Sequence, residues 1–407
     1  GADRLRPLAD ARGADARYAA VQALRRAFDW PRFVVLQDGD GELPVDLDNA
    51  LAVEAFAGPL GRRDVAVIEE LFPGDGGLAA RGPEGGYVHE LVVPLLAPAP
   101  APRPLDPPPL GALTSAARRA PGGDWLYAKL SCGPAAADRV LEAAALPVVR
   151  RALASGAASA WFFVRYDEPH WHLRLRVRGD RARLRGEVQP ALEDACAPLL
   201  EEGTVWRLAY DTYDREVERY GGVEGMAAAE DIFHADSEAV ASLLPRTRGG
   251  PDDARWQAAL LGLDALLGDL GLGEGERLGL VGAMRASFAL EFRAPGDPLR
   301  HGIGAAYRPR RAAIDGLFAP SAGGDVAALR EAFAARSARV AEPAERLRAL
   351  ARSGRLTRPL PAIAAALLHM HANRWFASAA REHEAVLYDF LERTYAARAA
   401  RKGRRGP

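Results

Sequence analysis

The segment at residues 161–179, WFFVRYDEPHWHLRLRVRG, constrains the fold of this chain more than any other. Two runs rich in aromatic and β-branched residues flank a short turn at Asp167–Pro169, which is typical of adjacent strands. Side chains alternate between the two faces of a strand, so the second run has a basic face and an apolar face. The basic row consists of His172, Arg174, Arg176 and Arg178. The apolar row of Leu173, Leu175 and Val177 predicts a face that packs against a core.

The basic row has two interpretations. Three guanidiniums and an imidazole repel one another unless water or an anion faces them. The row is therefore either a solvent-exposed edge strand, whose cations prevent unwanted strand pairing, or a wall that binds carboxylates. The second interpretation uses the planar guanidinium, which holds a carboxylate through two parallel hydrogen bonds as lysine cannot. His170 and His172 also form an H-x-H pair, but no further ligand is evident, which disfavours a metal site.

The hydrophobic periodicity along the rest of the chain predicts an α+β fold. In the front segment a helix is expected at 18–28 and strands at 33–36, 43–47 and 87–95. Further strands are expected at 125–132, 161–166, 172–177 and 205–210. Helices are expected at 136–155, 182–200, 223–244, 252–270, 274–291, 327–351 and 360–397. The expected architecture is a strand-rich front segment, followed by a mixed sheet domain with a helical C-terminal half.

This pattern predicts four parts. They are a strand-rich segment at 1–96, a proline-rich linker at 97–123, a main domain at 124–397 and a basic, disordered tail at 398–407. The linker is expected because Ala97 to Pro109 is dense in proline, which disfavours both helix and sheet.

Composition limits the classes of function. The 407 residues include 53 basic and 54 acidic side chains, which argues against direct binding of nucleic acid by phosphate neutralisation. Cys132 and Cys196 are the only cysteines, too few for a disulfide framework or a thiolate metal site. The sequence has neither a long apolar stretch nor a secretory signal, so we expect a cytoplasmic protein without a membrane partner. It also lacks the P-loop, nucleophile-elbow and H-E-x-x-H motifs of common cofactor and metal sites.

A second motif is TYDREVERYGG at residues 212–222. If its middle is helical, Glu216 and Arg219 lie one turn apart and pair with each other. On its own this would be an ordinary surface salt bridge. The Gly221-Gly222 step that follows predicts a sharp turn that brings the pair close to other backbone.

A third motif, LLHMHANRW at residues 367–375, falls in the last expected helix. His369 and Asn373 are four residues apart and share a face, whereas His371 points elsewhere and precedes Arg374 by three residues. A lone helical histidine is usually structural. A partly buried imidazole at position 369 would also suit a general acid or base.

These motifs, in this order and preceded by WLYAKL at 125–130, resemble the C-terminal elimination domain of class I lanthipeptide dehydratases and the related thiopeptide-type bacteriocin biosynthesis proteins. The resemblance covers residues 124–397. The stretches PRFVVLQDGDGELPVDLDN at 31–49 and YVHELVVPL at 87–95 are similar to the end of the glutamylation region that precedes this domain in the family. We therefore expect either a fragment of a full-length dehydratase or a split-type protein.

The resemblance implies a carbon–oxygen lyase that eliminates glutamate from glutamylated Ser or Thr, leaving dehydroalanine or dehydrobutyrine in lanthipeptide or thiopeptide biosynthesis. The implied partners are a glutamylated precursor peptide with its leader, a glutamylation enzyme or domain that uses glutamyl-tRNA, and a second copy in a homodimer. No metal or organic cofactor is implied.

The family's motifs map onto individual residues. The resemblance implies that His369 transfers the proton and that Arg176 and Arg219 clamp the carboxylate and the enolate. Arg174 would be a second clamp, and Glu216 would orient an arginine or share the proton transfer. Substrate contacts are also expected from Asn373, Arg374 and His371. His371 remains an alternative to His369 as the residue that transfers the proton.

Two other functions compete with elimination. A thiopeptide pyridine synthase resembles the same domain but joins two dehydroamino acids in a formal aza-[4+2] cycloaddition. The presence of the whole Arg, Glu, Arg and His set argues against it, because that reaction expels no glutamate. A non-catalytic module would instead capture a leader peptide by β-augmentation on the strand edges near residues 33–47.

Overall fold

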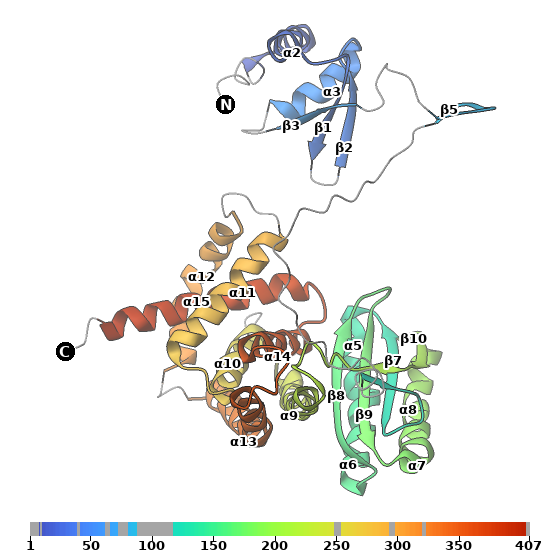
Figure 1. Cartoon of the computed structure of the whole chain (residues 1–407), viewed down its shortest axis with the longest axis vertical. Coiled ribbons are helices and arrows are strands. Elements are labelled where there is room, and N and C mark those ends of the chain that lie inside the picture. The colour runs from blue at the N-terminus through green and yellow to red at the C-terminus, as the bar shows by residue number, and fades with distance from the viewer. Residues whose placement is uncertain are drawn as a thin grey trace. The chain divides into compact units, whose positions relative to one another are not determined.

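The computed structural model describes residues 8, 10–38, 41–61, 66–71, 80–87, 117–247, 254–292, 298–319 and 323–403. The chain divides into two compact units, Gly1–Leu105 and Asp106–Pro407. The division falls within the segment expected to be a linker, of which residues 117–123 are described. The predicted α+β class is confirmed, with antiparallel sheets in both units and a helical C-terminal half (Figure 1).

The described part of the first unit contains a three-stranded antiparallel sheet of order β2-β1-β3 and the helices α2 and α3. Its elements are α2 (Ala14–Phe28), β1 (Phe33–Asp38), β2 (Gly41–Asp46), α3 (Ala50–Leu60) and β3 (Val67–Glu70). The expected hairpin is confirmed, because Phe33 pairs with Asp46 and Val35 with Pro44. Val34 buries its side chain in a core shared with the helices. A separate ladder joins β4 (Ala80–Gly82) to β5 (Gly85–Tyr87), and residues 88–95 of the strand expected at 87–95 lie outside the described part.

The second unit begins with a four-stranded antiparallel sheet of order β10-β7-β9-β8. The strands are β7 (Trp125–Cys132), β8 (Ala158–Tyr166), β9 (His172–Gly179) and β10 (Val205–Tyr210). All four were expected from the sequence. The strand with the basic row, β9, pairs with β7 on one side and β8 on the other. The interpretation of β9 as a solvent-exposed edge strand is therefore wrong, because the preceding strand β8 pairs with one of its edges and the more distant strand β7 pairs with the other.

Helices between the strands bury the apolar row of β9. They are α5 (Ala137–Val140) and α6 (Leu146–Ser155), joined by a π-helical turn, and α7 (Arg181–Arg183) and α8 (Gln189–Glu201), joined by another. The side chains of Leu173 and Val177 are almost completely buried within the core that these helices share with the sheet. A short ladder between β6 (Arg118–Arg119) and β11 (Tyr213–Asp214) lies in the same unit.

The C-terminal half consists of helices. They are α9 (Val223–Thr247), α10 (Ala254–Asp269), α11 (Glu274–Glu291), α12 (Pro298–Leu317), α13 (Asp325–Arg352), α14 (Leu360–Trp375) and α15 (Ala380–Gly403). Helix α12 was not expected from the sequence. Helices α9 and α14 both contact β8 at the edge of the sheet (Figure 1). Within the described residues, no helix is long and apolar enough to cross a membrane.

The prediction of a single helix over residues 360–397 is wrong, because α14 ends at Trp375 and a separate helix, α15, begins at Ala380. Phe376 is extended, with φ −110° and ψ 122°, and Ala379 has a left-handed φ of 48°. Both residues interrupt the helical hydrogen bonds, and α15 then folds back against α14. Helix α15 continues to Gly403, so the segment expected to be a disordered tail is helical over residues 398–403.

Candidate active site

A cavity of about 800 Å³ lies between the sheet and helices α9, α14 and α15. Six of the eight site residues expected from the sequence line it, namely Arg174, Arg176, Glu216, Arg219, His369 and Asn373. They come from β9, from the segment after β11 and from α14, which are far apart along the chain.

Arg176 lies in a cage of aromatic rings. The ladder register places Tyr127 of β7 and Phe162 of β8 directly beside it, and Tyr213 of β11 completes the cage. The guanidinium carbon lies 4.5, 5.3 and 4.6 Å from the centres of these three rings, respectively. Arg176 is only 8% exposed, and burial lowers its pKa. It forms no ion pair or hydrogen bond with the residues that the structure describes, and its Nε atom is buried without a partner.

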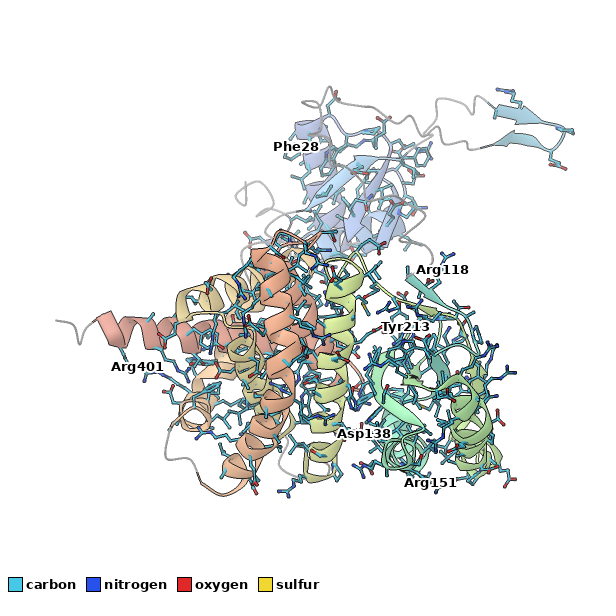
Figure 2. All side chains as sticks on the ribbon, turned by 60° about the horizontal axis from the view of Figure 1, so that its bottom comes forward. Phe28, Arg118, Asp138, Arg151, Tyr213 and Arg401 are labelled. Carbon is cyan, nitrogen blue, oxygen red and sulfur yellow. The ribbon has the colours of Figure 1, made fainter. Side chains whose placement is uncertain are left out.

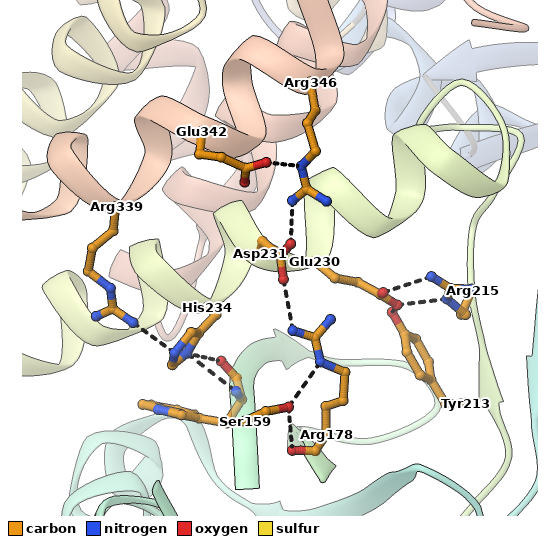
Figure 3. A network of polar contacts seen from close by, with 11 residues as sticks. Ser159, Arg178, Tyr213, Arg215, Glu230, Asp231, His234, Arg339, Glu342 and Arg346 are labelled. Carbon is orange, nitrogen blue, oxygen red and sulfur yellow. Dashed lines mark hydrogen bonds and ion pairs between the residues drawn. The ribbon is translucent and has the colours of Figure 1, made fainter. Parts of the chain in front are cut away.

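Tyr213 is held in place by a buried polar cluster, and it lies between the strands and α9 in the view of Figure 2. Its hydroxyl donates a hydrogen bond of 3.0 Å to Glu230 of α9, and Arg215 donates two bonds of 2.7 Å to the same carboxylate (Figure 3). This buried cluster anchors the segment after β11 to α9. It also holds the Tyr213 ring against Arg176.

Arg174 packs against the ring of Tyr166, with the guanidinium carbon 3.4 Å from the ring centre. Its Nε donates to His172 Nε2 at 3.0 Å, while His172 Nδ1 lies 2.7 Å from the carbonyl oxygen of His170. These partners place the proton of a neutral His172 on Nδ1, and burial lowers its pKa. Both nitrogens of His172 are thus occupied, so the H-x-H pair does not offer two free metal ligands.

Arg178, at the end of the basic row, has a structural role. Its Nη2 donates to Asp231 of α9 at 2.9 Å, and Arg346 of α13 binds the other oxygen of that carboxylate (Figure 3). Asp231 therefore links β9 to two helices. The basic row divides accordingly: Arg178 binds a carboxylate of the protein, whereas Arg174 and Arg176 face the cavity.

The segment with Glu216 and Arg219 is a turn rather than a helix. The backbone N–H of Arg219 donates to the Glu216 carbonyl at 2.9 Å, which brings the side chains within 3.3 Å, as the sequence spacing predicts. Gly221 follows with φ 82°, and a Cβ at this position would lie 2.7 Å from a side-chain atom of Ile363 on α14. Glycine therefore allows the turn to lie directly against α14.

His369 faces the cavity and is 27% exposed. Its Nδ1 lies 3.0 Å from both carboxylate oxygens of Glu384, which is 3% exposed. Arg381 and Tyr388 donate to the same carboxylate at 2.9 and 2.6 Å. Glu384 was not expected from the sequence. Its only signal is a glutamate fifteen residues after the histidine, which has no meaning until the helix is known to break.

His371 and Arg374 do not line the cavity. They are 0% and 1% exposed and lie in the protein interior around Asp236 of α9. His371 Nδ1 and Arg374 Nη1 lie 2.7 and 3.0 Å from this carboxylate, and Arg336 of α13 lies 2.9 Å from it. Trp375 donates to His371 Nε2 at 3.0 Å. The expected substrate contacts of His371 and Arg374 do not fit this position, because both side chains are buried away from the cavity and bind Asp236.

Residues 125–395 match the family model described as "Lantibiotic biosynthesis dehydratase C-term". The chain belongs to this family. The resemblance inferred from the motifs is thus confirmed, and the chain is related to enzymes of peptide dehydration. The match runs from β7 into α15 and includes every residue that lines the cavity.

Two curated relatives are proteins of lantibiotic biosynthesis and agree with this family assignment. The chain is 28% identical over 228 residues to the subtilin biosynthesis protein SpaB of Bacillus subtilis, a match that covers 54% of this chain and 22% of SpaB. It is 27% identical over 235 residues to the nisin biosynthesis protein NisB of Lactococcus lactis subsp. lactis, over 55% of this chain and 22% of NisB. The matched part is therefore about a fifth of the length of either relative.

Two solved structures show the same fold. The tRNA-dependent lantibiotic dehydratase MibB from Microbispora sp. 107891 aligns with a TM-score of 0.54 and 24% identity, over 98% of this chain and 40% of MibB. The pyridine synthase TbtD from thiomuracin biosynthesis aligns with a TM-score of 0.50 and 21% identity, over 68% of this chain and 98% of TbtD. The fold thus occurs in proteins with two different reactions.

Proposed function

We propose that the second unit eliminates glutamate from glutamylated Ser or Thr residues of a precursor peptide and leaves dehydroalanine or dehydrobutyrine. One observation carries this proposal. Arg176 is a buried cation in the wall of the cavity that forms no ion pair or hydrogen bond with the described residues. A buried charge is costly unless it is paired, so a substrate that brings its own carboxylate complements this wall.

In the proposed reaction, a base removes the Cα proton of the esterified residue, a double bond forms between Cα and Cβ, and the Cβ–O bond breaks. The electron pair of that bond leaves with glutamate as its carboxylate. His369 accepts the proton as general base, because it contacts the cavity and its Nε2 forms no hydrogen bond with the described residues.

The arginines stabilise negative charge as it develops. Negative charge builds up on the enolate oxygen of the peptide and on the departing carboxylate, and fixed cations in a cavity with little water stabilise both strongly. We assign these positions to Arg176 and Arg219, with Arg174 as a further carboxylate clamp. Glu216 lies 3.3 Å from Arg219 and orients its guanidinium.

A second candidate is a pyridine synthase, which the fold shared with TbtD supports. Cycloaddition of two dehydroamino acids releases no carboxylate, so it gives Arg176 no anion to bind. A third candidate is capture of a leader peptide by the first unit. In its three-stranded sheet β1 is paired on both sides, and β2 and β3 are the edges available for β-augmentation.

The proposed partners follow from the reaction. They are a glutamylated precursor peptide with its leader and a glutamylation enzyme or domain that uses glutamyl-tRNA. We also propose a cytoplasmic location and a homodimer.

The test mixes the protein with a chemically glutamylated Ser peptide and follows the peptide mass. The expected product is lighter than the unmodified peptide by one water, and Arg176→Ala, Arg219→Ala and His369→Ala abolish its formation. The matched control is Arg183→Ala, which removes an exposed arginine that pairs with Glu187 on the same helical segment. Unchanged turnover in all three site variants would contradict the site. A six-membered ring formed from a peptide with two dehydroalanines would instead establish the synthase.

A further inference from the structure

We infer that Glu384 is the positioning residue for His369, which sets the tautomer and the orientation of the imidazole that removes the proton. The catalytic part of this inference rests on the proposed function, in which His369 is the base. The structural part concerns the ring itself and can be tested without turnover.

The pairing arises from the break between α14 and α15. After Phe376 and Ala379 the chain reverses, and the first turns of α15 return along α14. Glu384 thereby comes to lie beside His369, with both oxygens 3.0 Å from Nδ1. An unbroken helix over residues 360–397 would carry Glu384 more than 20 Å along the axis from His369 at about 1.5 Å per residue.

The carboxylate is held firmly in place. Tyr388, one turn further along α15, donates its hydroxyl to Oε1 at 2.6 Å, and Arg381 donates to Oε2 at 2.9 Å. Arg381 is itself fixed by two hydrogen bonds to Glu291 of α11, at 3.0 and 2.5 Å. Three donors therefore converge on a carboxylate that is only 3% exposed, as a buried charge requires.

This arrangement has a defined consequence for the imidazole. A carboxylate accepts hydrogen bonds only, so a neutral His369 places its proton on Nδ1 and leaves the lone pair on Nε2. His369 lines both the main cavity and a smaller one of about 260 Å³ bordered by α11 and α14, and Glu384 lines only the smaller one. When Nε2 takes the substrate proton, the positive charge that forms on the ring lies against Glu384.

Burial of Glu384 behind His369 also explains why it does not compete for the substrate proton. It does not line the main cavity, whereas His369 does. Glu384 thus acts through the imidazole. This makes it a positioning residue rather than a catalytic one.

The experiment uses the full chain with ring-¹⁵N histidine and compares wild type, Glu384→Ala and Glu384→Gln by long-range ¹H–¹⁵N correlation. The His369→Gln variant identifies the His369 signals among those of the eight histidines. We expect wild-type His369 to carry its proton on Nδ1, and Glu384→Ala to populate both tautomers. Glu384→Gln keeps the side-chain volume and an acceptor oxygen, so it separates the effect of charge from that of packing.

Turnover of the glutamylated peptide is measured on the same samples. In Glu384→Ala, kcat falls by about 10²-fold while KM stays within about twofold, because substrate binding is intact and the base is misoriented. Glu384→Gln retains more activity than Glu384→Ala. The control is Glu392→Gln on the same helix, which removes a partly buried ion pair with Arg285 away from His369 and leaves kcat unchanged.

The outcomes separate the two proposals. If Glu384→Ala shows a mixture of His369 tautomers but the wild-type protein shows no turnover, the pairing of Glu384 with His369 is supported and the proposed function is rejected. Turnover in wild type, together with a wild-type tautomer and a kcat within twofold in Glu384→Ala, would reject the positioning role alone.

Discussion

The side-chain amide of Asn373 on α14 bonds both backbone polar groups of Arg165 on β8. Its Oδ1 accepts from the Arg165 N–H at 2.9 Å, and its Nδ2 donates to the Arg165 carbonyl at 2.8 Å. The amide thus occupies the edge of the sheet much as a neighbouring strand would. His369, one turn earlier on α14, is thereby held at a fixed distance from the sheet that carries Arg176.

We predict that Asn373→Ala weakens both the fold and the site. The substitution leaves two backbone groups of β8 without partners, which costs about 2–3 kcal/mol of unfolding free energy. Elimination also slows, because α14 is no longer fixed to the sheet. Urea denaturation and the peptide mass assay measure the two effects. The control is Asn49→Ala, which removes the cap of α3 in the first unit and leaves elimination unchanged.

We predict that replacing Arg176 lowers the activity strongly but changes the stability of the fold little. Arg176→Leu removes a buried cation that forms no ion pair within the described part of the chain, so loss of the contacts with three aromatic rings is offset by relief of desolvation. The unfolding free energy changes by less than about 1 kcal/mol, while kcat/KM falls by about 10²- to 10³-fold.

Arg215 provides the matched comparison, since it is equally buried but paired with Glu230. Arg215→Leu leaves a buried carboxylate without its cation and costs about 3–5 kcal/mol. Equal destabilisation by the two leucine variants would mean that Arg176 has a protein partner in solution. Denaturation curves of both variants, recorded side by side, decide this.

Removal of the carboxylate at Asp236 is expected to destabilise the second unit strongly. Asp236→Asn leaves Arg336, Arg374 and His371 without their common anion in the interior, at a cost of about 3–5 kcal/mol. Asp231→Asn is the control, because Asp231 is 29% exposed and its loss costs about 1 kcal/mol or less. Thermal unfolding of the two variants at pH 7 gives the comparison, and similar losses would contradict the structural role of Asp236.

Histidine burial makes stability depend on pH. Burial lowers the pKa of four histidines, His172, His234, His371 and His383. Their pKa values in the unfolded chain are near the ordinary value of about 6.5, so the unfolded chain binds more protons than the folded one below that pH. The unfolding free energy therefore falls as the pH is lowered from 7 through 6.5.

Urea midpoints at pH 7.5, 6.5 and 5.5 measure this dependence. His172→Gln keeps a neutral side chain and removes one titrating group, so its midpoint falls less steeply with decreasing pH than that of wild type. A midpoint that rises toward pH 5.5 would show that these histidines are not buried as neutral rings.

Local patterns were enough to predict much of the fold. The alternation in β9 predicted a basic face and an apolar face, and the strands β7, β8 and β10 were expected at or near their observed positions because each is a short run rich in aromatic and other apolar residues. The spacing of Glu216 and Arg219 predicted their pairing, although a turn rather than a helix provides it. Such features depend on residues a few positions apart, which the sequence displays directly.

The amino-acid sequence by itself determined the α+β class, the family and the residue types available for catalysis. Only the tertiary structure decided which of them meet. It placed β9 inside the sheet, buried His371 and Arg374 around Asp236, and left Arg176 without an ion pair among the residues that the structure describes. The break before α15 brought Glu384 to His369. The physical reason is that pairing and burial are set by contacts between segments distant in sequence, whereas periodicity reports only on each segment's own faces.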